Sequence, residues 1–555
     1  MSAKLLTEFS ERMVAALQRR AVAIPSRWAL EYVKNADGSA MSFRKFPWQR
    51  EMIDSRAPHN VAAKGAQLGI SHCILCRGIC GNDMEKRDVL YVLPSMNPTG
   101  NDFSNTRFDS LVNASPHLKA LYDKANVGLK RTATNNFYIR GAQSRTGGKS
   151  VPAAILVLDE IDEIPREFLP LVRERMSGQE EKLEWDISTP TIPDHGIDKL
   201  WQESTQEHFY FPCPSCGRHV RLTYPECLEV VGDDPDSTQV LKESYLKCPE
   251  CKSKIPHEAK GDIFAKARFV ASVSGKEKRG FHVNQLYSCT VTPGEVAASA
   301  IRSNFSEWDA QEFWNSKMGK AFAPEGSKLS ESLINSCRST HMNNSPFKLD
   351  VVTMGVDVGS WLHVEVCEWH LGDALGWDVN TNATPRVLFA GKVRSFEELD
   401  SLMSNYRVNF CVIDAMPETR KAFEFAQRWW GYVKMCYYAQ GVQAKQLVET
   451  SWDSGEPIIN VNRTAWMDQA LGRFKPGVGG NQRILLPMDV PFEYIEHLKT
   501  PSRIWTRDKN GNPVASWKTP DNKADHHAHS RTYAEIALPL ALSAGQVVSM
   551  ENPLD

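Results

Sequence analysis

The stretch VAAKGAQLGISHCILC, residues 61–76, decides how the first half of the chain is interpreted. A phosphate-binding loop has the pattern G-x-x-x-x-G-K-[ST], whose backbone N–H groups and lysine hold phosphates while the hydroxyl binds Mg²⁺. Gly69 and Ser71 match this pattern, whereas Ile70 replaces its lysine and Lys64 replaces its first glycine. A lysine side chain is long and flexible, so Lys64 can reach the phosphates from the start of the loop. The loop alone does not separate a nucleotide site with a displaced lysine from a chance match.

Three further signals favour a working nucleotide site. The run ILVLDEID (155–162) ends in Asp159 and Glu160, which puts one carboxylate on Mg²⁺ and the next where it polarises the attacking water. The alternative is a buried strand that happens to end in acids. Gln49 follows an aromatic residue, as in adenine-recognising Q motifs, and Thr189 lies at a strand end where helicase-like motors couple hydrolysis to movement. The predicted ATP site therefore contains Gln49, Lys64, Gly65, Gln67, Gly69, Ser71, Asp159, Glu160 and Thr189.

Apolar runs and helical patterns alternate between Val61 and Pro190, which predicts an α/β sheet. We expect buried parallel strands at 88–94 and 153–159, the end of another at 187–190, and a helix at 71–83. Three cysteines recur on this helix at i, i+3 and i+7, the spacing of a buried apolar stripe, so they are expected in the core. They are Cys73, Cys76 and Cys80.

Two CPxC pairs in the turn-rich section 205–262 predict a structural zinc site of four thiolates. The 31 residues between the pairs (217–247) exceed the common spacing, but zinc ribbons tolerate insertions there. A reduced, metal-free pair of turns is the alternative. The expected zinc ligands are Cys213, Cys216, Cys248 and Cys251.

A second α/β pattern predicts a ribonuclease H-like fold. Residues 351–359 and 362–370 are expected to form a hairpin, followed by strands at 386–393 and 409–415 and a closing helix at 524–542. Asp357 and Asp414 would then lie on neighbouring strands and, with a third ligand from the last helix, bind two divalent metal ions that activate water. Asp525 and His529 share one helix face and are both candidates for that ligand. The alternatives are turn-forming aspartates and a solvated helix start.

Length and composition indicate a globular protein of two or three domains. The chain has 555 residues, a net charge of −2 and 42% hydrophobic residues, which excludes a globally basic protein. Its N-terminus reads as an amphipathic helix rather than a signal peptide, and no apolar run would span a bilayer, so a cytosolic protein with reduced thiols is expected. The expected divisions are an N-terminal helical region (1–40), an ATPase domain (41–320) with the zinc insertion (205–262), a linker (321–350) and a nuclease domain (351–555).

These motifs in this order resemble the large terminase subunit of tailed bacteriophages, in the lambda-type (GpA) family. The similarity extends from about 26–32 to 530–538. It implies an ATP-driven motor that pumps double-stranded DNA into the procapsid, and a nuclease that cuts concatemeric DNA. By position, Lys64 and Gly69 would hold phosphates, Ser71 and Asp159 would bind Mg²⁺, and Glu160 would be the catalytic carboxylate. Gln49 would contact adenine, Thr189 would belong to the coupling motif, and Asp357 and Asp414 would bind Mg²⁺ or Mn²⁺.

The resemblance also implies partners and a place of action. They are the small terminase subunit, the procapsid portal, further copies of this chain in a ring, and the host cytoplasm rather than a membrane or the mature virion. The sequence departs from the family where alignment puts His529 at the third nuclease position, one turn after Asp525. An arginine finger stays open between Arg140 and Arg145. Two rivals are a DNA translocase with an inactive nuclease fold and a non-catalytic zinc-ribbon scaffold that binds DNA.

Overall fold

The computed structural model describes residues 23–549 except 123, 143–150, 325, 350, 372–381, 440–441, 443–445, 450–456, 476–481 and 508–511. The helix expected in the first 20 residues and Arg145 lie outside these described residues. The chain divides into two compact units between Ala323 and Pro324. Within the described part, none of the helices combines the length and the apolar character needed to cross a membrane.

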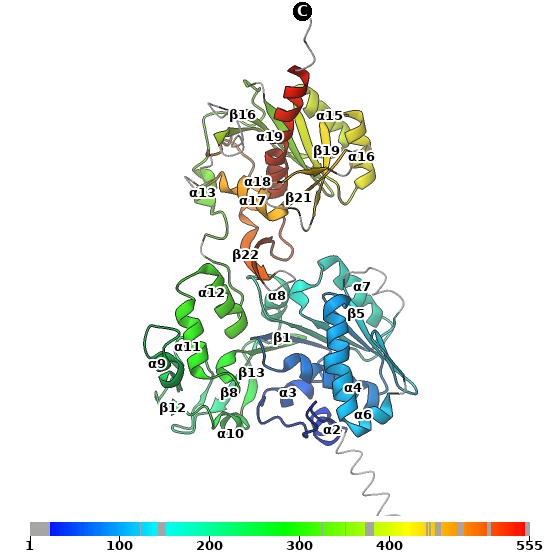
Figure 1. The fold of residues 1–555 in the computed structure, drawn as a ribbon, viewed down its shortest axis with the longest axis vertical. Helices are drawn as coiled ribbons and strands as arrows, with labels where there is room; N and C mark the ends of the chain where they lie inside the picture. Colours follow the sequence, from blue (N-terminus) through cyan, green and yellow to red (C-terminus); the bar gives the residue numbers. More distant parts are fainter. Residues whose placement is uncertain are drawn as a thin grey trace, which may run out of the picture. The chain divides into compact units, whose positions relative to one another are not determined.

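The first unit is built on a mixed sheet whose central strands are parallel (Figure 1). The strand order is β13-β8-β14-β1-β7-β6-β2-β5-β4-β3, and every pair from β8 to β5 is parallel. Residues of β2, β6 and β7 are buried throughout, as expected for strands covered on both faces. The central strands are β1 (His59–Lys64), β2 (Val89–Leu93), β5 (Asn136–Gly141), β6 (Ile155–Asp159), β7 (Leu183–Ser188), β8 (Glu207–Pro212) and β14 (Lys278–Val283).

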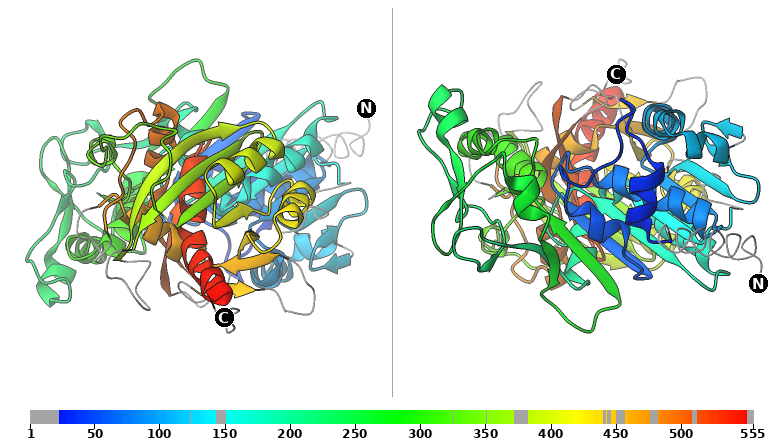
Figure 2. Two further views of the ribbon diagram at one scale, coloured as in Figure 1. Left: turned by 90° about the horizontal axis from the view of Figure 1, so that it is seen from above. Right: turned by 90° about the horizontal axis from the view of Figure 1, so that it is seen from below.

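Helix α4 (Ile70–Met84) follows β1 and packs against the sheet, with α2 (Pro25–Tyr32) and α3 (Gln49–Ile53) beside it (Figure 2, right). Trp28 and Trp48 are fully buried in this layer. The predicted core position of the three cysteines on α4 is confirmed, since Cys73, Cys76 and Cys80 are all buried. Parallel strands place their carboxyl ends at one edge of the sheet, and this edge is where ligands bind in such folds.

The cysteine-rich insertion is shorter at its start than expected, because 207–212 form strand β8 of the main sheet, parallel to β14. The insertion that follows carries a small antiparallel sheet in the order β10-β11-β12. Its elements are β9 (His219–Val220), β10 (Leu228–Glu229), α9 (Thr238–Glu243), β11 (Tyr245–Lys247), β12 (Lys254–Ile255) and α10 (Lys260–Phe264).

The remaining elements of the first unit extend both edges of the sheet and cover it. The edge strands are β3 (Lys124–Asn126), β4 (Leu129–Arg131) and β13 (Arg268–Ala271). The helices are α5 (Ser110–Ala114), α6 (Pro116–Leu121), α7 (Leu169–Arg173), α8 (Gly196–Gln202), α11 (Pro293–Arg302) and α12 (Glu307–Glu312). Two π-helical segments, η1 (Met96–Gly100) and η2 (Phe103–Asp109), follow β2, and a third, η7 (Phe313–Lys317), follows α12. Short 3₁₀ turns are η3 (Ile161–Glu163), η4 (Arg166–Phe168), η5 (Glu174–Met176) and η6 (Gln285–Tyr287).

The second unit contains a seven-stranded mixed sheet in the order β17-β16-β15-β18-β19-β21-β20. The predicted hairpin is confirmed, because β15 and β16 are antiparallel, and β15 lies parallel to β18 as expected for Asp357 and Asp414. The strands are β15 (Val352–Val358), β16 (Leu362–His370), β17 (Thr384–Val393), β18 (Phe410–Asp414), β19 (Val433–Tyr438), β20 (Val448–Glu449) and β21 (Ile458–Val461).

Helix α19 (His526–Ser549) packs across this sheet against β15, β16 and β18 (Figure 2, left). Gly355 permits the close approach, since a Cβ there would lie 2.0 Å from the Ser530 carbonyl oxygen. The other elements are α15 (Phe396–Asn405), α16 (Thr419–Arg428), α17 (Arg463–Gly472), α18 (Phe492–Lys499) and the hairpin β22 (Ser502–Arg507) and β23 (Pro513–Lys518).

The segment 321–350, expected to be a linker, differs from that expectation. It carries a helix, α13 (Glu331–Asn335), and buries Leu329, Ile334 and Cys337 in a core of the second unit. From Pro324 onward the segment is thus part of that unit.

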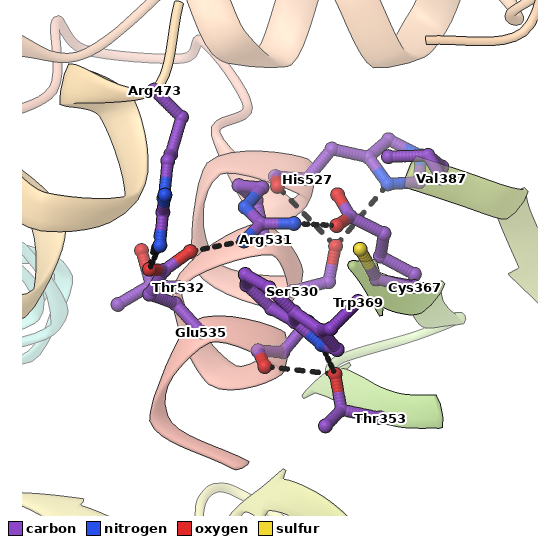
Figure 3. A network of polar contacts seen from close by, with 12 residues as sticks. Thr353, Cys367, Trp369, Val387, Arg473, His527, Ser530, Arg531, Thr532 and Glu535 are labelled. Carbon is purple, nitrogen blue, oxygen red and sulfur yellow. Dashed lines mark hydrogen bonds and ion pairs between the residues drawn. The ribbon is translucent and has the colours of Figure 1, made fainter. Parts of the chain in front are cut away.

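Four buried charged side chains hold α19 against its neighbours, and Figure 3 labels three of them, Arg473, Arg531 and Glu535. Arg531 contacts Glu365 of β16 and Glu535 of its own helix, and Arg473, the residue that follows α17, lies 2.6 Å from Glu535 Oε1. All four are fully buried, and both guanidinium groups lie 5.4 Å from the ring of Trp369. A buried charge is tolerated only when it is paired and hydrogen-bonded, so this network commits α19 to one position on the sheet.

Candidate nucleotide, zinc and nuclease sites

The displaced lysine lies at the carboxyl end of β1 and contacts the predicted catalytic glutamate. Lys64 Nζ is 2.9 Å from Glu160 Oε1 and 3.5 Å from Thr189 Oγ1. These residues end or follow β1, β6 and β7, which are neighbours in the sheet. Burial would lower the pKa of Lys64, but Glu160 and Asp159 outweigh it and raise that pKa. The lysine is therefore charged and lies close to the carboxylates of Glu160 and Asp159.

The pair predicted to hold Mg²⁺ is also assembled. Ser71 Oγ donates to Asp159 Oδ1 at 3.0 Å, and the Tyr91 hydroxyl donates to Asp159 Oδ2 at 2.6 Å. Burial and the neighbouring charge of Glu160 raise the pKa of Asp159. For Glu160, burial acts in the same direction, but Lys64 and hydrogen bonds from Thr189 and Ser188 prevail and lower its pKa. Glu160 itself has a left-handed backbone (φ 57°), an unusual conformation of the kind found at functional sites.

The loop between β1 and α4 has the shape of an anion site. Gly69 has φ 69° and precedes the first turn of α4, whose N–H groups no side chain caps. An uncapped helix N-terminus attracts phosphate through its free N–H groups and dipole. Gly65 allows close approach, because a Cβ there would lie 3.0 Å from the Ser316 carbonyl oxygen. A pocket of about 430 Å³ lies over this loop, and Lys64, Gln67, Gly69, Ser71, Glu160 and Thr189 all line it.

Gln49, the residue expected to contact adenine, lies beneath the loop. Its side chain is 2% exposed, and Nε2 donates to the Gly69 carbonyl at 2.7 Å. Trp48 Nε1 donates in the same way to the Leu68 carbonyl at 3.0 Å. These two side chains shape the loop, while Phe46 lines the pocket.

The structure adds an arginine that the sequence analysis missed. Arg107, on η2, lines the nucleotide pocket, where its charge opposes protonation of Lys64 and His72. Arg140, one of the two candidates for an arginine finger, instead donates to the Ile139 carbonyl at 2.9 Å and to that of Gly128. No sequence motif surrounds Arg107, so its position beside the pocket is evident only in the folded structure.

The four predicted zinc ligands converge in the insertion. The sulfur atoms of Cys213, Cys216, Cys248 and Cys251 all lie within 4.8 Å of one another. A hydrogen bond from Ser253 and others nearby lower the pKa of the Cys251 thiol to about 6. Four thiols that meet on two tight turns form the donor set of a structural zinc site. They therefore fit a zinc ion.

The two aspartates expected in the nuclease site lie near the carboxyl ends of neighbouring parallel strands. Asp357 is in β15 and Asp414 ends β18. Burial raises the pKa of Asp414 to about 6, and the charge of Asp357 adds to that rise. Carboxylate oxygens in such a pair are the ligands that Mg²⁺ and Mn²⁺ prefer.

The last helix presents three polar residues to this face, and the one that touches Asp357 was not predicted. His526 Nδ1 is 2.8 Å from Asp357 Oδ2, and this hydrogen bond raises the pKa of His526. Asp525 instead accepts a hydrogen bond from Thr519 and lies 3.4 Å from His529 Nε2. Burial opposes ionisation of Asp525, but the charge and hydrogen bonds around it, His529 first, lower its pKa. His529 Nδ1 is 3.0 Å from the Tyr438 hydroxyl.

The comparisons with known proteins agree with this architecture. The family model for the ATPase domain of the phage terminase large subunit gpA matches residues 35–269, and the model for the gpA endonuclease domain matches residues 278–544. None of the curated proteins matches the chain. The second match begins at β14, within the first compact unit.

Solved structures of large terminases are among those similar to the chain. The large terminase of a thermophilic bacteriophage is 10% identical with a TM-score of 0.31, over 91% of this chain and 98% of that one. The ATPase domain from Thermus phage P74-26 is 11% identical with a TM-score of 0.31, over 52% and 96%. The nuclease of phage G20c with bound magnesium is 11% identical with a TM-score of 0.23, over 38% and 95%.

The two family models together extend over most of the sequence. The fold is thus that of a motor ATPase followed by a ribonuclease H-like nuclease. The chain belongs to the gpA family of phage terminase large subunits, the enzymes that package viral DNA with ATP and cut it.

Proposed function

We propose that the pocket around Lys64 is the ATP site of the packaging motor. The observation that carries this proposal is the meeting of two pairs, Lys64 with Glu160 and Ser71 with Asp159, at the carboxyl ends of neighbouring parallel strands. The uncapped N-terminus of α4 supplies the N–H groups that bind phosphate oxygens. Gly65, Gln67 and Gly69 form the loop between them.

Each of these side chains has a defined task in the proposed hydrolysis. The Ser71 hydroxyl and the Asp159 carboxylate would hold Mg²⁺, which when bound neutralises phosphate charge. Lys64 moves from Glu160 to the phosphates, and the released Glu160 carboxylate orients and polarises the attacking water. Thr189 faces both Lys64 and Glu160, so it is placed to relay their rearrangement into β7. Gln49 positions the loop through Gly69 rather than binding adenine.

We propose that Asp357, Asp414 and Asp525 provide the carboxylates of the nuclease site for Mg²⁺ or Mn²⁺. His529 then positions Asp525, which gives the two candidates for the third ligand separate roles. Within the described residues, the ligand atoms compactly grouped with Asp357 belong to His363 and His526. His526 holds the Asp357 carboxylate in its orientation, since the two are in direct contact.

The insertion is proposed to hold a structural zinc ion through Cys213, Cys216, Cys248 and Cys251. The metal would join the two turns that carry these thiols, and strands β9 to β12 of the insertion are only two or three residues long. Membership of the family supports the remaining assignments: double-stranded DNA as substrate, the small terminase subunit and the procapsid portal as partners, a ring of copies during packaging, and action in the host cytoplasm.

Replacement of Glu160 tests the motor site. Glu160→Gln is expected to abolish ATP hydrolysis while nucleotide binding persists, because Lys64 and the loop are unchanged. Glu167→Gln, an exposed residue of η4 just downstream, is the matched control and keeps full turnover. Turnover that survives in Glu160→Gln would refute the role of Glu160.

Plasmid cleavage tests the nuclease site. Supercoiled DNA with Mg²⁺ or Mn²⁺ is expected to be nicked or linearised by the full chain and left intact by Asp357→Ala. The exposed Glu397→Gln is the control and cleaves normally. If the unmodified chain does not cleave DNA in either metal while its ATPase activity is intact, a motor with an inactive nuclease fold would be favoured.

A further inference from the structure

Four histidine rings lie against one another next to the nuclease carboxylates, and the proposed cleavage reaction uses only one of them. They come from three elements: His363 from β16, His497 from α18, and His526 and His527 from α19. His363 stacks on His526 with ring centres 4.4 Å apart, and His527 lies 5.0 Å from His363 and 5.3 Å from His497. Three elements that are distant in the sequence thus bring imidazoles to one point.

Three of the rings offer nitrogen atoms close enough to share one ion. One ring nitrogen each from His363, His497 and His527 lies within 4.8 Å of the others. These side chains are only 5%, 7% and 1% exposed, so water does not compete for the nitrogens. Bonds of about 2.0–2.1 Å to a tetrahedral metal would bring the nitrogens to about 3.4 Å from one another, which small ring rotations achieve.

Hydrogen bonding within the cluster is incomplete in a way that points to a ligand. Among the described residues, Nδ1 of His363 and Nδ1 of His497 are buried and have no hydrogen-bond partner. A buried nitrogen without a partner costs about 1–3 kcal/mol, so a simple packed core would not be expected to keep two side by side. The opposite nitrogens, Nε2, lie 3.9 and 4.0 Å from Glu493 Oε1. Both distances exceed the length of a hydrogen bond, so Glu493 lies near the two rings without accepting a hydrogen bond from them.

We propose that His363, His497 and His527 form a second metal site in the nuclease unit, for a transition-metal ion of the zinc class. Three neutral imidazoles suit zinc, nickel, cobalt or copper, whereas Mg²⁺ prefers oxygen ligands. In the β15–β16 pair His363 stands directly opposite Asp357, and His526 contacts both residues. An ion in this site would link β16, α18 and α19 to one another beside the carboxylates of the proposed nuclease site.

The test measures bound zinc in the full chain after the proposed cysteine site has been removed. Cys213→Ser/Cys251→Ser protein is stripped with a chelator, loaded with Zn²⁺ in excess Mg²⁺, desalted and analysed for metal. We expect about one zinc ion per chain to remain, and His497→Gln in this background to lose it. His370→Gln, on the same strand as His363 but exposed, is the matched control and keeps the ion.

Two further results decide between sites and guard against a misfolded variant. Asp414→Asn in the same background is expected to keep the zinc; its loss there, with retention in His497→Gln, would place the ion on the carboxylates and overturn the proposal. Zinc-edge X-ray absorption of the folded parent should show about three imidazole nitrogens around the metal. No retained zinc in the parent, or a shell dominated by oxygen, would also overturn it.

Discussion

Removal of Arg531 should loosen the helix that completes the nuclease unit. Arg531→Met deletes a fully buried guanidinium that contacts Glu365 and Glu535. Glu535 keeps Arg473, but among the residues that the structure describes Glu365 keeps only the hydrogen bond from the Tyr494 hydroxyl at 2.6 Å. The loss therefore strands one buried charge, and breaking a buried pair in this way costs about 3–5 kcal/mol.

Hydrogen exchange of the α19 amides in the full chain measures this cost locally. At about 1.4 kcal/mol per factor of ten, protection should fall at least a hundredfold. The double variant Arg531→Met/Glu365→Gln should recover part of it, because the stranded charge is removed. Arg428→Met, which breaks an exposed ion pair with Asp400, should change protection little. Protection within threefold of the original in Arg531→Met, or no recovery in the double variant, would refute the reasoning.

Three other outcomes are expected. Burial lowers the pKa of His282 to about 4, against about 6.5 in the unfolded chain. Because the unfolded chain binds the proton more tightly, the first unit should lose about 3 kcal/mol of stability as the pH falls from 6.5 to 4. Urea unfolding measured against pH should show this loss, and His282→Gln should lack it. Gly355→Ala should destabilise the second unit by about 3 kcal/mol in urea unfolding, because its Cβ would meet the backbone of α19, whereas Gly359→Ala, whose nearest neighbour is at 3.5 Å, should not. Cys251→Ser should release the proposed zinc ion of the insertion and make the insertion sensitive to proteases between residues 213 and 259. Equal protease resistance of the unmodified chain with and without a chelator would count against a structural metal.

Much of the fold follows from local patterns in the sequence. Hydrophobic periodicity and turn residues, which can be read in short stretches of sequence, predict three features that the structure contains. They are the strand–loop–helix around Lys64, the parallel strands that end in Asp159 and Ser188, and the hairpin that carries Asp357. The helical spacing of the three cysteines on α4 likewise predicted their burial.

The features that sequence reasoning missed depend on contacts between distant segments. Arg107 reaches the nucleotide pocket from a π-helical segment without a motif. His363 faces Asp357 only through the register of β15 and β16, and His497 joins it from another helix. Strand β8 falls within the stretch expected to form the insertion, because its pairing partner β14 lies about 70 residues further along. Such placements arise from tertiary packing, which no short window of sequence encodes.

If the proposed ATP site is correct, the contact between Lys64 and Glu160 would make nucleotide binding an exchange of anions. Lys64 is paired with a carboxylate of the protein, so phosphate bound in the proposed ATP site would exchange one negative partner of the lysine for another. The displaced partner is the group proposed to activate water. In the proposed ATP site, phosphate binding and water activation would therefore both depend on this one ion pair.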